Sequence, residues 1–399
     1  MSNQTPRPVI RMRPNKSPQR VRFGAPWVFA DEVVLDRRAR KIPAGSIIEL
    51  HANDGERLGL CAFNAESRIV CRMLDRDLDA EIARDWLRAR IQRALELRER
   101  LYDSPFYRLV HAEADGLPGV VIDRFGDVAA IQPNAAWAEA MFDDLVAAVT
   151  EVAGISTIVK NGMGRARKLE GLAEELAVVR GQLDAPVPVQ MNGATYFADL
   201  LKGQKTGLFF DQRDNHAFAA RLARDASVLD VFSHVGGFAL AALAGGARCA
   251  DVVDASASAL DLAVHGAEVS GFAGQFATIR GDAFEIMSSL ASEGRDYGLV
   301  VCDPPAFAPA KPALEAGLRA YERVARLGAG LVSRGGYLVL CSCSHAVDPA
   351  RFKAASVRGI GRAGRQAQLI HSGSAGPDHP QHPHLAESGY LKALFFRLD

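Results

Sequence analysis

The second half of the chain alternates short apolar segments with longer segments rich in alanine and leucine. The apolar segments are expected to form buried strands at 227–232, 249–256, 276–284, 297–305 and 335–344. A further apolar segment, 390–398, follows a loop. Because buried strands that alternate with helices form parallel sheets covered on both faces, the pattern predicts a doubly wound α/β domain.

The first half has a different pattern. Residues 1–75 contain short strand-like segments separated by turns, including an Asn-Asp-Gly hairpin turn. Residues 79–102 place apolar side chains at helical spacing, which predicts an amphipathic helix, and further strands and a helix follow. A segment rich in proline and glycine near residue 185 is expected to be a linker. We therefore predict a β domain over 1–75, a small α+β domain over 76–185 and the α/β domain over 186–399.

Composition narrows the class of protein. A chain of 399 residues is too long for one ordinary core, and no run of 18 or more apolar residues is present, so no membrane span is expected. The polar N-terminus argues against a secretory signal, and the six cysteines are too scattered to form a disulfide framework. A reduced, cytoplasmic protein is expected.

Charge is balanced overall but not locally. Residues 1–30 carry six basic side chains and no acidic one, although the formal net charge of the chain is zero. Such a block can bind polyanions, and it can equally be a solvated tail. Charge alone leaves nucleic-acid binding open.

Acidic residues end four successive predicted strands, where open α/β sheets bind ligands. After the first of them, Asp230, a loop with Gly236 and Gly237 opens a helix, and paired glycines let a ligand approach backbone amides. The loop matches neither the GxGxxG nor the Walker A pattern. The other three carboxylates belong to Asp254, Asp282 and Asp303.

The four carboxylates suggest an adenosine-type ligand. Asp254 could accept both ribose hydroxyls, and Asp282 could accept a hydrogen bond from an exocyclic amine. A single aspartate at a strand end is more commonly a helix cap, but four in succession favour a ligand. Because a phosphate loop is missing, the adenosine need not carry a pyrophosphate, which points to S-adenosylmethionine. An NAD-dependent dehydrogenase is the rival interpretation, weakened by the glycine spacing.

The chain resembles class I S-adenosylmethionine-dependent methyltransferases at motifs I, II, III, IV and VI, in the segments DVFSHVGGF, VVDAS, GDAF, DPPAF and CSCS. It is most similar to the bacterial large-subunit rRNA cytosine-5 methyltransferases of the RlmI type, through the segment KGQKTGLFFDQRDN at 202–215. Residues 114–127 resemble the central domain of that branch, and residues 22–33 resemble its N-terminal PUA domain, an RNA-binding β module. The resemblance implies a Rossmann-like methyltransferase sheet with an N-terminal PUA-like β domain and a small central α+β domain.

The resemblance also implies residue roles. Asp254 would hold the ribose, Asp282 the adenine amine, and the loop with Gly236 and Gly237 the methionine part. The full set expected at the cofactor is Gln212, Arg213, Asp230, Phe232, Gly236, Gly237, Asp254, Ala255, Asp282, Ala283 and Asp303. Gln212 and Arg213 would lie near the cofactor or the target base. The sequence departs from the branch at His234-Val235, where Tyr-Thr is usual, and this change could alter a contact to the methionine end.

The segment LVLCSCSHAVDP at 338–349 brings two cysteines to a strand end. Carbon 5 of cytosine accepts a methyl group only after a thiolate adds to carbon 6 and makes carbon 5 nucleophilic. Cys343, beside Asp303 at the end of the preceding strand, meets this need, and the resemblance assigns the nucleophile to the same residue. Asp303 could bind the base edge and stabilise the charge that develops.

Other functions for these residues are weaker. Cys341 and Cys302 are expected to be buried and inert. A Cys-x-Cys metal site needs two more ligands and no CxxC pair is present, so no metal is expected. A disulfide between neighbouring strand positions is disfavoured by geometry. The histidine-rich segment 371–385 is interpreted as a proline-stiffened loop before the last strand.

We predict an S-adenosylmethionine-dependent RNA methyltransferase that forms 5-methylcytidine in large-subunit rRNA through a covalent cysteine adduct. The expected partner is that rRNA or an assembly intermediate, with no membrane, and the sequence leaves open whether the protein is a homodimer. A guanine-nitrogen rRNA methyltransferase is one alternative, because Asp-Pro-Pro followed by an aromatic residue also occurs in enzymes that methylate nitrogens. A non-catalytic RNA-binding protein with a relict cofactor site is the other.

Overall fold

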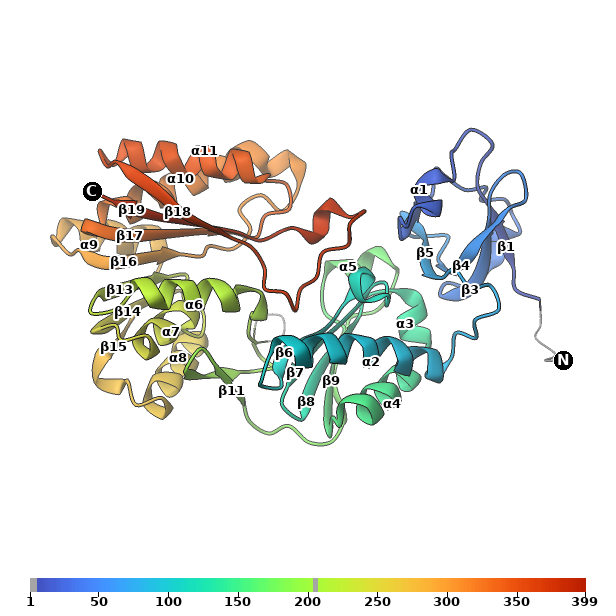
Figure 1. Ribbon diagram of the computed structural model, residues 1–399, viewed down its shortest axis with the longest axis horizontal. Coiled ribbons are helices and arrows are strands. Elements are labelled where there is room, and N and C mark those ends of the chain that lie inside the picture. Colours follow the sequence, from blue (N-terminus) through green and yellow to red (C-terminus); the bar gives the residue numbers. More distant parts are fainter. Residues whose placement is uncertain (1–5, 204–206) are drawn as a thin grey trace. The chain divides into compact units, whose positions relative to one another are not determined.

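The computed structural model describes residues 6–203 and 207–399 (Figure 1). The chain forms two compact units. The first unit extends to Ala185 and adds the segment Asp378–Ala386. The second contains Pro186–Pro377 and Glu387–Asp399. Both small domains expected from the sequence lie within the first unit, and the division into three domains stays a prediction.

The first sheet of the first unit has five strands in the order β1-β3-β4-β5-β2. Its strands are β1 (Val9–Arg11), β2 (Trp27–Phe29), β3 (Ser46–His51), β4 (Arg57–Phe63) and β5 (Ile69–Asp75). The predicted Asn-Asp-Gly turn joins β3 to β4, with Gly55 at a φ of 92° that favours glycine. A short helix, α1 (Gln19–Arg22), lies between β1 and β2 in the chain.

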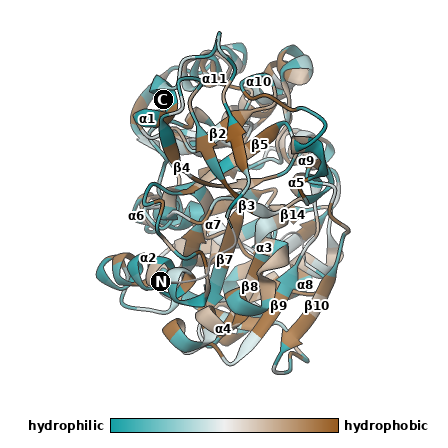
Figure 2. Cartoon of the chain, turned by 90° about the vertical axis from the view of Figure 1, so that its right-hand side faces the viewer, coloured by the Kyte–Doolittle hydropathy of each residue, from teal (hydrophilic) through white to brown (hydrophobic). Residues whose placement is uncertain are grey.

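The second sheet of the first unit has the order β10-β9-β8-β7-β6. Its strands are β6 (Phe106–His111), β7 (Val120–Phe125), β8 (Val128–Pro133), β9 (Thr157–Asn161) and β10 (Leu176–Arg180). The helices are α2 (Arg84–Leu101), α3 (Ala136–Ala140), α4 (Phe142–Ala153) and α5 (Arg165–Leu169). The predicted amphipathic helix is α2, which buries Leu87, Ile91 and Leu95 and exposes most of its charged side chains, so that its ribbon is largely teal in Figure 2. Arg98 is an exception and is fully buried.

The second unit begins with a hairpin where the sequence predicted a linker. Strands β11 (Val187–Met191) and β12 (Ala194–Ala198) pair antiparallel. Asn192 and Gly193 both have positive φ, at 51° and 79°, which is the requirement of a tight two-residue hairpin turn. Pro188 is tolerated because a two-stranded ribbon leaves each strand at an edge.

The main sheet confirms the doubly wound α/β fold. Its strand order is β15-β14-β13-β16-β17-β19-β18, and β19 runs in the opposite direction to the other strands. The strands are β13 (Ser227–Val231), β14 (Cys249–Asp254), β15 (Phe276–Arg280), β16 (Tyr297–Cys302), β17 (Val332–Ser342), β18 (Ala367–Gly373) and β19 (Lys392–Leu398). Sequence analysis predicted all of these except β18, whose side chains are mostly exposed at the edge of the sheet.

Helices cover both faces of this sheet (Figure 1). One face packs against α6 (Arg213–Leu222), α7 (Gly237–Ala244) and α8 (Ala257–Val269). The other packs against α9 (Ala283–Ser292), α10 (Leu314–Gly330) and α11 (Pro349–Arg362). In β16, Leu299 and Val301 join the first core and Val300 and Cys302 the second, which explains why the strand is apolar at every position.

Each fully buried aliphatic side chain contributes about 1.5–3 kcal/mol to folding.

In the part of the chain that the structure describes, no helix is both long and apolar enough to cross a membrane.

Candidate active site

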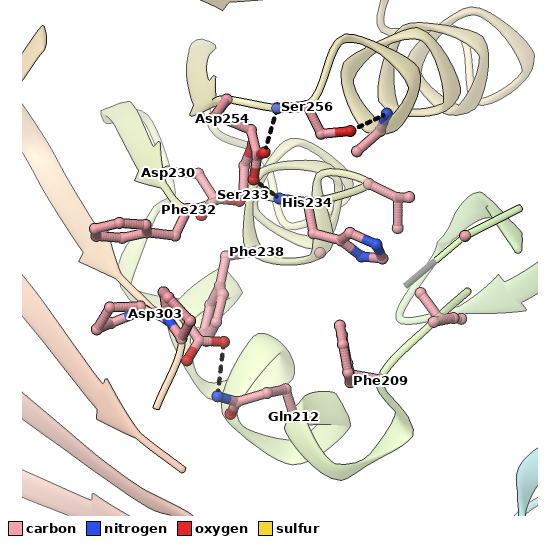
Figure 3. A pocket seen from close by; sticks show the side chains of 18 of the residues that line it. Phe209, Gln212, Asp230, Phe232, Ser233, His234, Phe238, Asp254, Ser256 and Asp303 are labelled. Atoms are coloured by element: carbon pink, nitrogen blue, oxygen red, sulfur yellow. Dashed lines mark hydrogen bonds between the residues drawn. The ribbon is translucent and has the colours of Figure 1, made fainter. Parts of the chain in front are cut away.

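A cavity of about 770 Å³ lies at the carboxyl ends of β13, β14, β15 and β16. The strand order reverses between β14 and β16, on either side of β13, and ligands bind at such a switch point in open α/β sheets. Figure 3 shows side chains from several loops pointing toward this space. Its volume is within the usual range for a small-molecule site.

The loop after β13 is tightly folded. Phe232, His234 and Gly236 have φ values of 64°, 50° and 79°, and the first two are unusual for residues with a side chain. Such strain costs on the order of 1 kcal/mol or more for each residue and is concentrated at functional sites. A side chain at Gly237 would lie 2.8 Å from the ring of His216, so only glycine fits at the start of α7.

Asp230, at the end of β13, is held under this loop. Its Oδ2 accepts a hydrogen bond from the Ala239 backbone N–H at 3.0 Å, and its Oδ1 is buried without a hydrogen-bond partner among the described residues. Burial raises the pKa of Asp230 to about 8, and the negative charges of Asp303 and Asp254 act in the same direction. A cation entering the cavity would stabilise the ionised carboxylate.

Asp254 and Asp282 support the neighbouring loops. Asp254 accepts the backbone N–H of His234 at 2.9 Å and that of Ser256 at 2.8 Å (Figure 3). Asp282 caps α9, with Oδ1 accepting the N–H groups of Phe284 and Glu285. The helix-cap role and a ligand role are compatible, because each carboxylate oxygen can accept more than one hydrogen bond.

Asp303 is connected to the segment before α6. The Gln212 side chain donates to Asp303 Oδ2 at 2.9 Å (Figure 3). Asn215 in turn donates to Gln212 Oε1 at 2.6 Å and to the Ser374 carbonyl at 3.1 Å. This chain of amides fixes the orientation of Gln212 and directs its N–H toward Asp303.

Cys343 sits at the end of β17 between two buried serines. The Ser344 hydroxyl accepts from the backbone N–H of Ala308 at 3.0 Å and lies 2.8 Å from the Tyr321 hydroxyl. Ser342 and Ser344 are fully buried, whereas Cys343 is half-buried and lines the cavity together with Asp303. The Ala308–Ser344 bond ties the Asp-Pro-Pro loop to the cysteine loop.

The other cysteines differ from Cys343. Burial raises the pKa of the Cys302 and Cys341 thiols far above the usual range, which keeps both protonated. Cys61 and Cys71 are buried in the first unit, and Cys249 is exposed. All six cysteines lie within the described residues, and none of them forms a disulfide bond.

Most of the residues expected at the site line the cavity. They are Gln212, Asp230, Phe232, Gly237, Asp254, Ala255, Asp282, Ala283, Asp303 and Cys343. Arg213 and Gly236 are not among the lining residues. Arg213 starts α6 with its guanidinium 5.6 Å from the Phe210 ring centroid, and Gly236 shapes the loop through its positive φ. Within the predicted segment 202–215, residues 204–206 lie outside the described part of the chain.

The structure adds lining residues that sequence reasoning did not select, among them Phe209, Asp211, His216 and Tyr390. His216 lies four residues after Gln212, at the spacing that places two side chains on the same face of a helix. This spacing could have predicted that His216 faces the same cavity as Gln212. Tyr390 had no such signal, because its hydroxyl reaches Asp211 at 2.5 Å across 179 positions of sequence. The atypical His234 also lines the cavity, with its ring centroid 5.2 Å from that of Phe209.

Among the residues that are described, no group of three or more histidine, cysteine or acidic side chains is arranged to hold a metal ion. The histidine-rich segment forms the predicted loop between β18 and β19, except that His371 lies at the end of β18.

The cavity suits an adenosine-type molecule with a cationic, polar end. Around it lie buried polar atoms without hydrogen-bond partners among the described residues, namely Asp230 Oδ1, Ser233 Oγ and His216 Nδ1. A polar ligand could satisfy such atoms, which otherwise cost about 1–3 kcal/mol each. Asp254 and Asp282 supply further acceptors at neighbouring strand ends.

Known proteins resemble the chain in sequence and in fold. A family model described as S-adenosylmethionine-dependent methyltransferase matches residues 180–397, and a PUA-like domain model matches residues 10–76. The "Ribosomal RNA large subunit methyltransferase I" of Aliivibrio fischeri (strain MJ11) is 34% identical over 379 residues, covering 94% of this chain and 95% of that protein.

Two solved structures share the fold. One is assigned as a SAM-dependent methyltransferase from Streptococcus mutans, with a TM-score of 0.81 and 18% identity, and the other is a methyltransferase complexed with SAH, with a TM-score of 0.82 and 19% identity. Each alignment covers 98% of this chain and 100% of the other. Since the family match covers more than half of the residues, the chain belongs to the S-adenosylmethionine-dependent methyltransferase family and uses S-adenosylmethionine as its cofactor.

Proposed function

We propose that this protein methylates carbon 5 of a cytidine in large-subunit rRNA and that Cys343 is the nucleophile. The relatives named as large-subunit rRNA methyltransferases support the class of substrate. The observation that carries the choice of atom is Cys343 itself, a half-buried thiol that lines the same cavity as Asp303. A nitrogen methyltransferase would have no use for a thiol at this position.

The surroundings of Cys343 suit a nucleophile that must hold one position. Its serine neighbours are buried and hydrogen-bonded, so the loop is anchored on both sides of the thiol. Cys302 and Cys341 are held as buried thiols and cannot compete for the base. Cys343 is therefore the cysteine of this site that can reach a substrate.

In the proposed reaction the Cys343 thiolate adds to carbon 6 of the cytosine, which makes carbon 5 nucleophilic. S-adenosylmethionine supplies the methyl group that carbon 5 accepts. Asp303, held in place by Gln212, hydrogen-bonds the polar edge of the base and orients the ring toward the thiolate. Loss of the carbon 5 proton and elimination of the Cys343 thiolate then restore the aromatic ring.

We propose that the loops after β13, β14 and β15 hold the cofactor. Asp254 would bind the ribose hydroxyls, Asp282 the adenine amine, and Asp230 with the backbone around Gly237 the methionine part. The buried, unpartnered Oδ1 of Asp230 supports this assignment, because it can receive a positively charged amino group. Phe232, Ala255 and Ala283 would form apolar walls of the same site.

We propose that the protein works in the cytoplasm, where the rRNA is. The N-terminal PUA-like domain would bind the RNA. Several basic side chains of the N-terminal block are engaged within the domain. Three form exposed ion pairs: Lys16–Asp31, Arg20–Glu32 and Arg22–Glu56. Exposed pairs contribute only about 0–1 kcal/mol, so phosphates can compete for these cations.

The proposal is tested by transfer of labelled methyl from S-adenosylmethionine to rRNA from a deletion strain, with the product nucleoside identified by mass spectrometry. We expect the label in 5-methylcytidine. Label in a methylguanosine would overturn the assignment of the reacting atom and of Cys343. If neither free rRNA nor ribosomal particles accept label, the proposed substrate is wrong, and a protein that also fails to bind S-adenosylmethionine would have a relict cofactor site.

The nucleophile is tested by Cys343→Ala. We expect turnover to fall by at least about a thousandfold, because the carbon 6 adduct cannot form, while S-adenosylmethionine affinity measured by calorimetry stays near wild type. Cys249→Ala, which removes an exposed thiol, is the matched control and should keep full activity. Methylation by Cys343→Ala at the wild-type rate would exclude the covalent mechanism.

A further inference from the structure

A buried lysine lies beside the loop that carries Cys343. Lys392 is the first residue of β19 and pairs in register with Ser342, the residue before the cysteine. Only 7% of its surface is exposed. A lysine is rarely buried without a specific partner, because removing an ammonium group from water is costly.

The partners of Lys392 belong to the cysteine loop. Its Nζ donates to the Ser344 carbonyl at 2.7 Å and to the Val347 carbonyl at 2.9 Å. Both acceptors lie just after Cys343, so the ammonium holds the loop in a fixed conformation. Two neutral carbonyls leave the positive charge itself uncompensated.

The charge of Lys392 is coupled to the thiol. Burial lowers the pKa of Lys392 to about 8, and negative charge on Cys343 and on Asp348 opposes this change. The coupling between two ionisable groups is mutual, so an ammonium that is favoured by a thiolate also favours that thiolate. At neutral pH the lysine is therefore charged and acts on Cys343.

We propose that Lys392 is a positioning residue that fixes the loop of Cys343 and keeps a larger fraction of this cysteine in the reactive thiolate form. The inference rests on the proposed role of Cys343 as nucleophile. The proton released from the thiol passes to solvent, so no further reactant is needed. A cation beside a cysteine is a general means of raising its thiolate fraction.

Other groups around the loop carry charge or can titrate. They are Asp303, which lines the same cavity, Tyr321 on α10, and His345 and Asp348 on the loop itself. Both aspartates oppose a thiolate when ionised. Among the described groups that these contacts bring to the loop, Lys392 supplies the positive charge at neutral pH, so we expect its loss to have the largest effect on the ionisation of Cys343.

The test follows alkylation of Cys343 by iodoacetamide from pH 6 to pH 10, with the modified peptide quantified by mass spectrometry. A Cys249→Ser background removes the exposed thiol, and the other four cysteines are buried. Lys392→Met should alkylate about tenfold more slowly than wild type at pH 7, since a neighbouring opposite charge shifts such an ionisation by one unit or more. The difference should narrow above pH 8, where Lys392 itself loses its charge.

Two further variants separate charge from folding. Lys392→Gln keeps a hydrogen-bond donor without the charge and should behave like Lys392→Met, so the test survives if Lys392→Met does not fold. Lys353→Met removes an exposed lysine from α11 and should leave the profile unchanged.

An unchanged pH profile in Lys392→Gln would overturn the inference. An equal slowing at every pH would also overturn it, because that result means altered access rather than altered charge. Alkylation does not require methyl transfer, so this result is independent of the Cys343→Ala assay. The two experiments can therefore fail separately.

Discussion

At the scale of single residues, Asp230 shows how burial changes chemistry. A carboxyl with a pKa of about 8 in the folded protein and about 4 in the unfolded chain binds its proton more tightly when folded. Its contribution to stability is therefore complete below about pH 4 and is lost as the pH rises through 8. The uncharged form belongs to the protein without ligand, and a cationic ligand group would favour ionisation.

We expect Asp230→Asn to remove this pH dependence. Between pH 6 and pH 9 the melting temperature of the ligand-free wild type should fall more than that of Asp230→Asn, because the variant has no proton to lose. Differential scanning calorimetry measures both. Asp296→Asn, at an exposed position, is the control and should follow the wild type. Parallel curves for wild type and Asp230→Asn would contradict the raised pKa.

At the scale of elements, the tip of β17 depends on contacts with other elements. Ser344 accepts a hydrogen bond from the loop after β16 and contacts the hydroxyl of Tyr321 on α10. Two separate elements therefore hold the loop that carries Cys343. The sequence places these three residues far apart, and the sheet and α10 bring them together.

We expect Ser344→Ala to reduce the methylation rate at least tenfold, because the Ala308 N–H and the Tyr321 hydroxyl lose a buried partner. Each group left without a hydrogen bond costs about 1–3 kcal/mol, which loosens the loop. S-adenosylmethionine affinity should change little. Single-turnover kinetics and calorimetry give the two values. Ser372→Ala, on exposed β18, is the control, and an equal loss there would contradict the explanation.

At the scale of the whole molecule, the chain leaves the second unit after Pro377 and returns to it at Glu387. Asp378 is completely buried within the first unit. Its carboxylate accepts the Arg108 backbone N–H at 3.0 Å, and its carbonyl accepts from Arg98 at 2.8 Å. These bonds attach the segment 378–386 to the second sheet of that unit.

Asp378→Ala should release this segment, because the buried Arg108 N–H loses its acceptor at a cost of about 1–3 kcal/mol. We expect faster protease cleavage within residues 374–387 and faster amide exchange there. Local probes are appropriate because a chain of two units need not unfold in one step. Glu387→Ala, at an exposed position, should leave cleavage unchanged. Cleavage at the wild-type rate in Asp378→Ala would show that other contacts hold the segment.

Local signals in the sequence had clear limits. The buried strands could be predicted because both of their faces are apolar. In β11, buried and exposed positions alternate as in a strand, but the proline within it favoured a linker. The Asn192-Gly193 turn was a direct hairpin signal within that segment. Strand β18 had no apolar pattern, since it lies at the sheet edge with most of its side chains in solvent.

The sequence by itself determined the fold class and the family, because buried parallel strands and the motifs at their ends can be read directly from the order of residues. The roles expected for the aspartates at the strand ends stay predictions. Only the tertiary structure decided which distant groups complete the site. The pairing of β19 with β17 places Lys392 beside the Cys343 loop, and Tyr390, just before β19, contacts Asp211 from the segment before α6. Such pairings bring together residues from distant parts of the chain, and no local pattern of side chains encodes them.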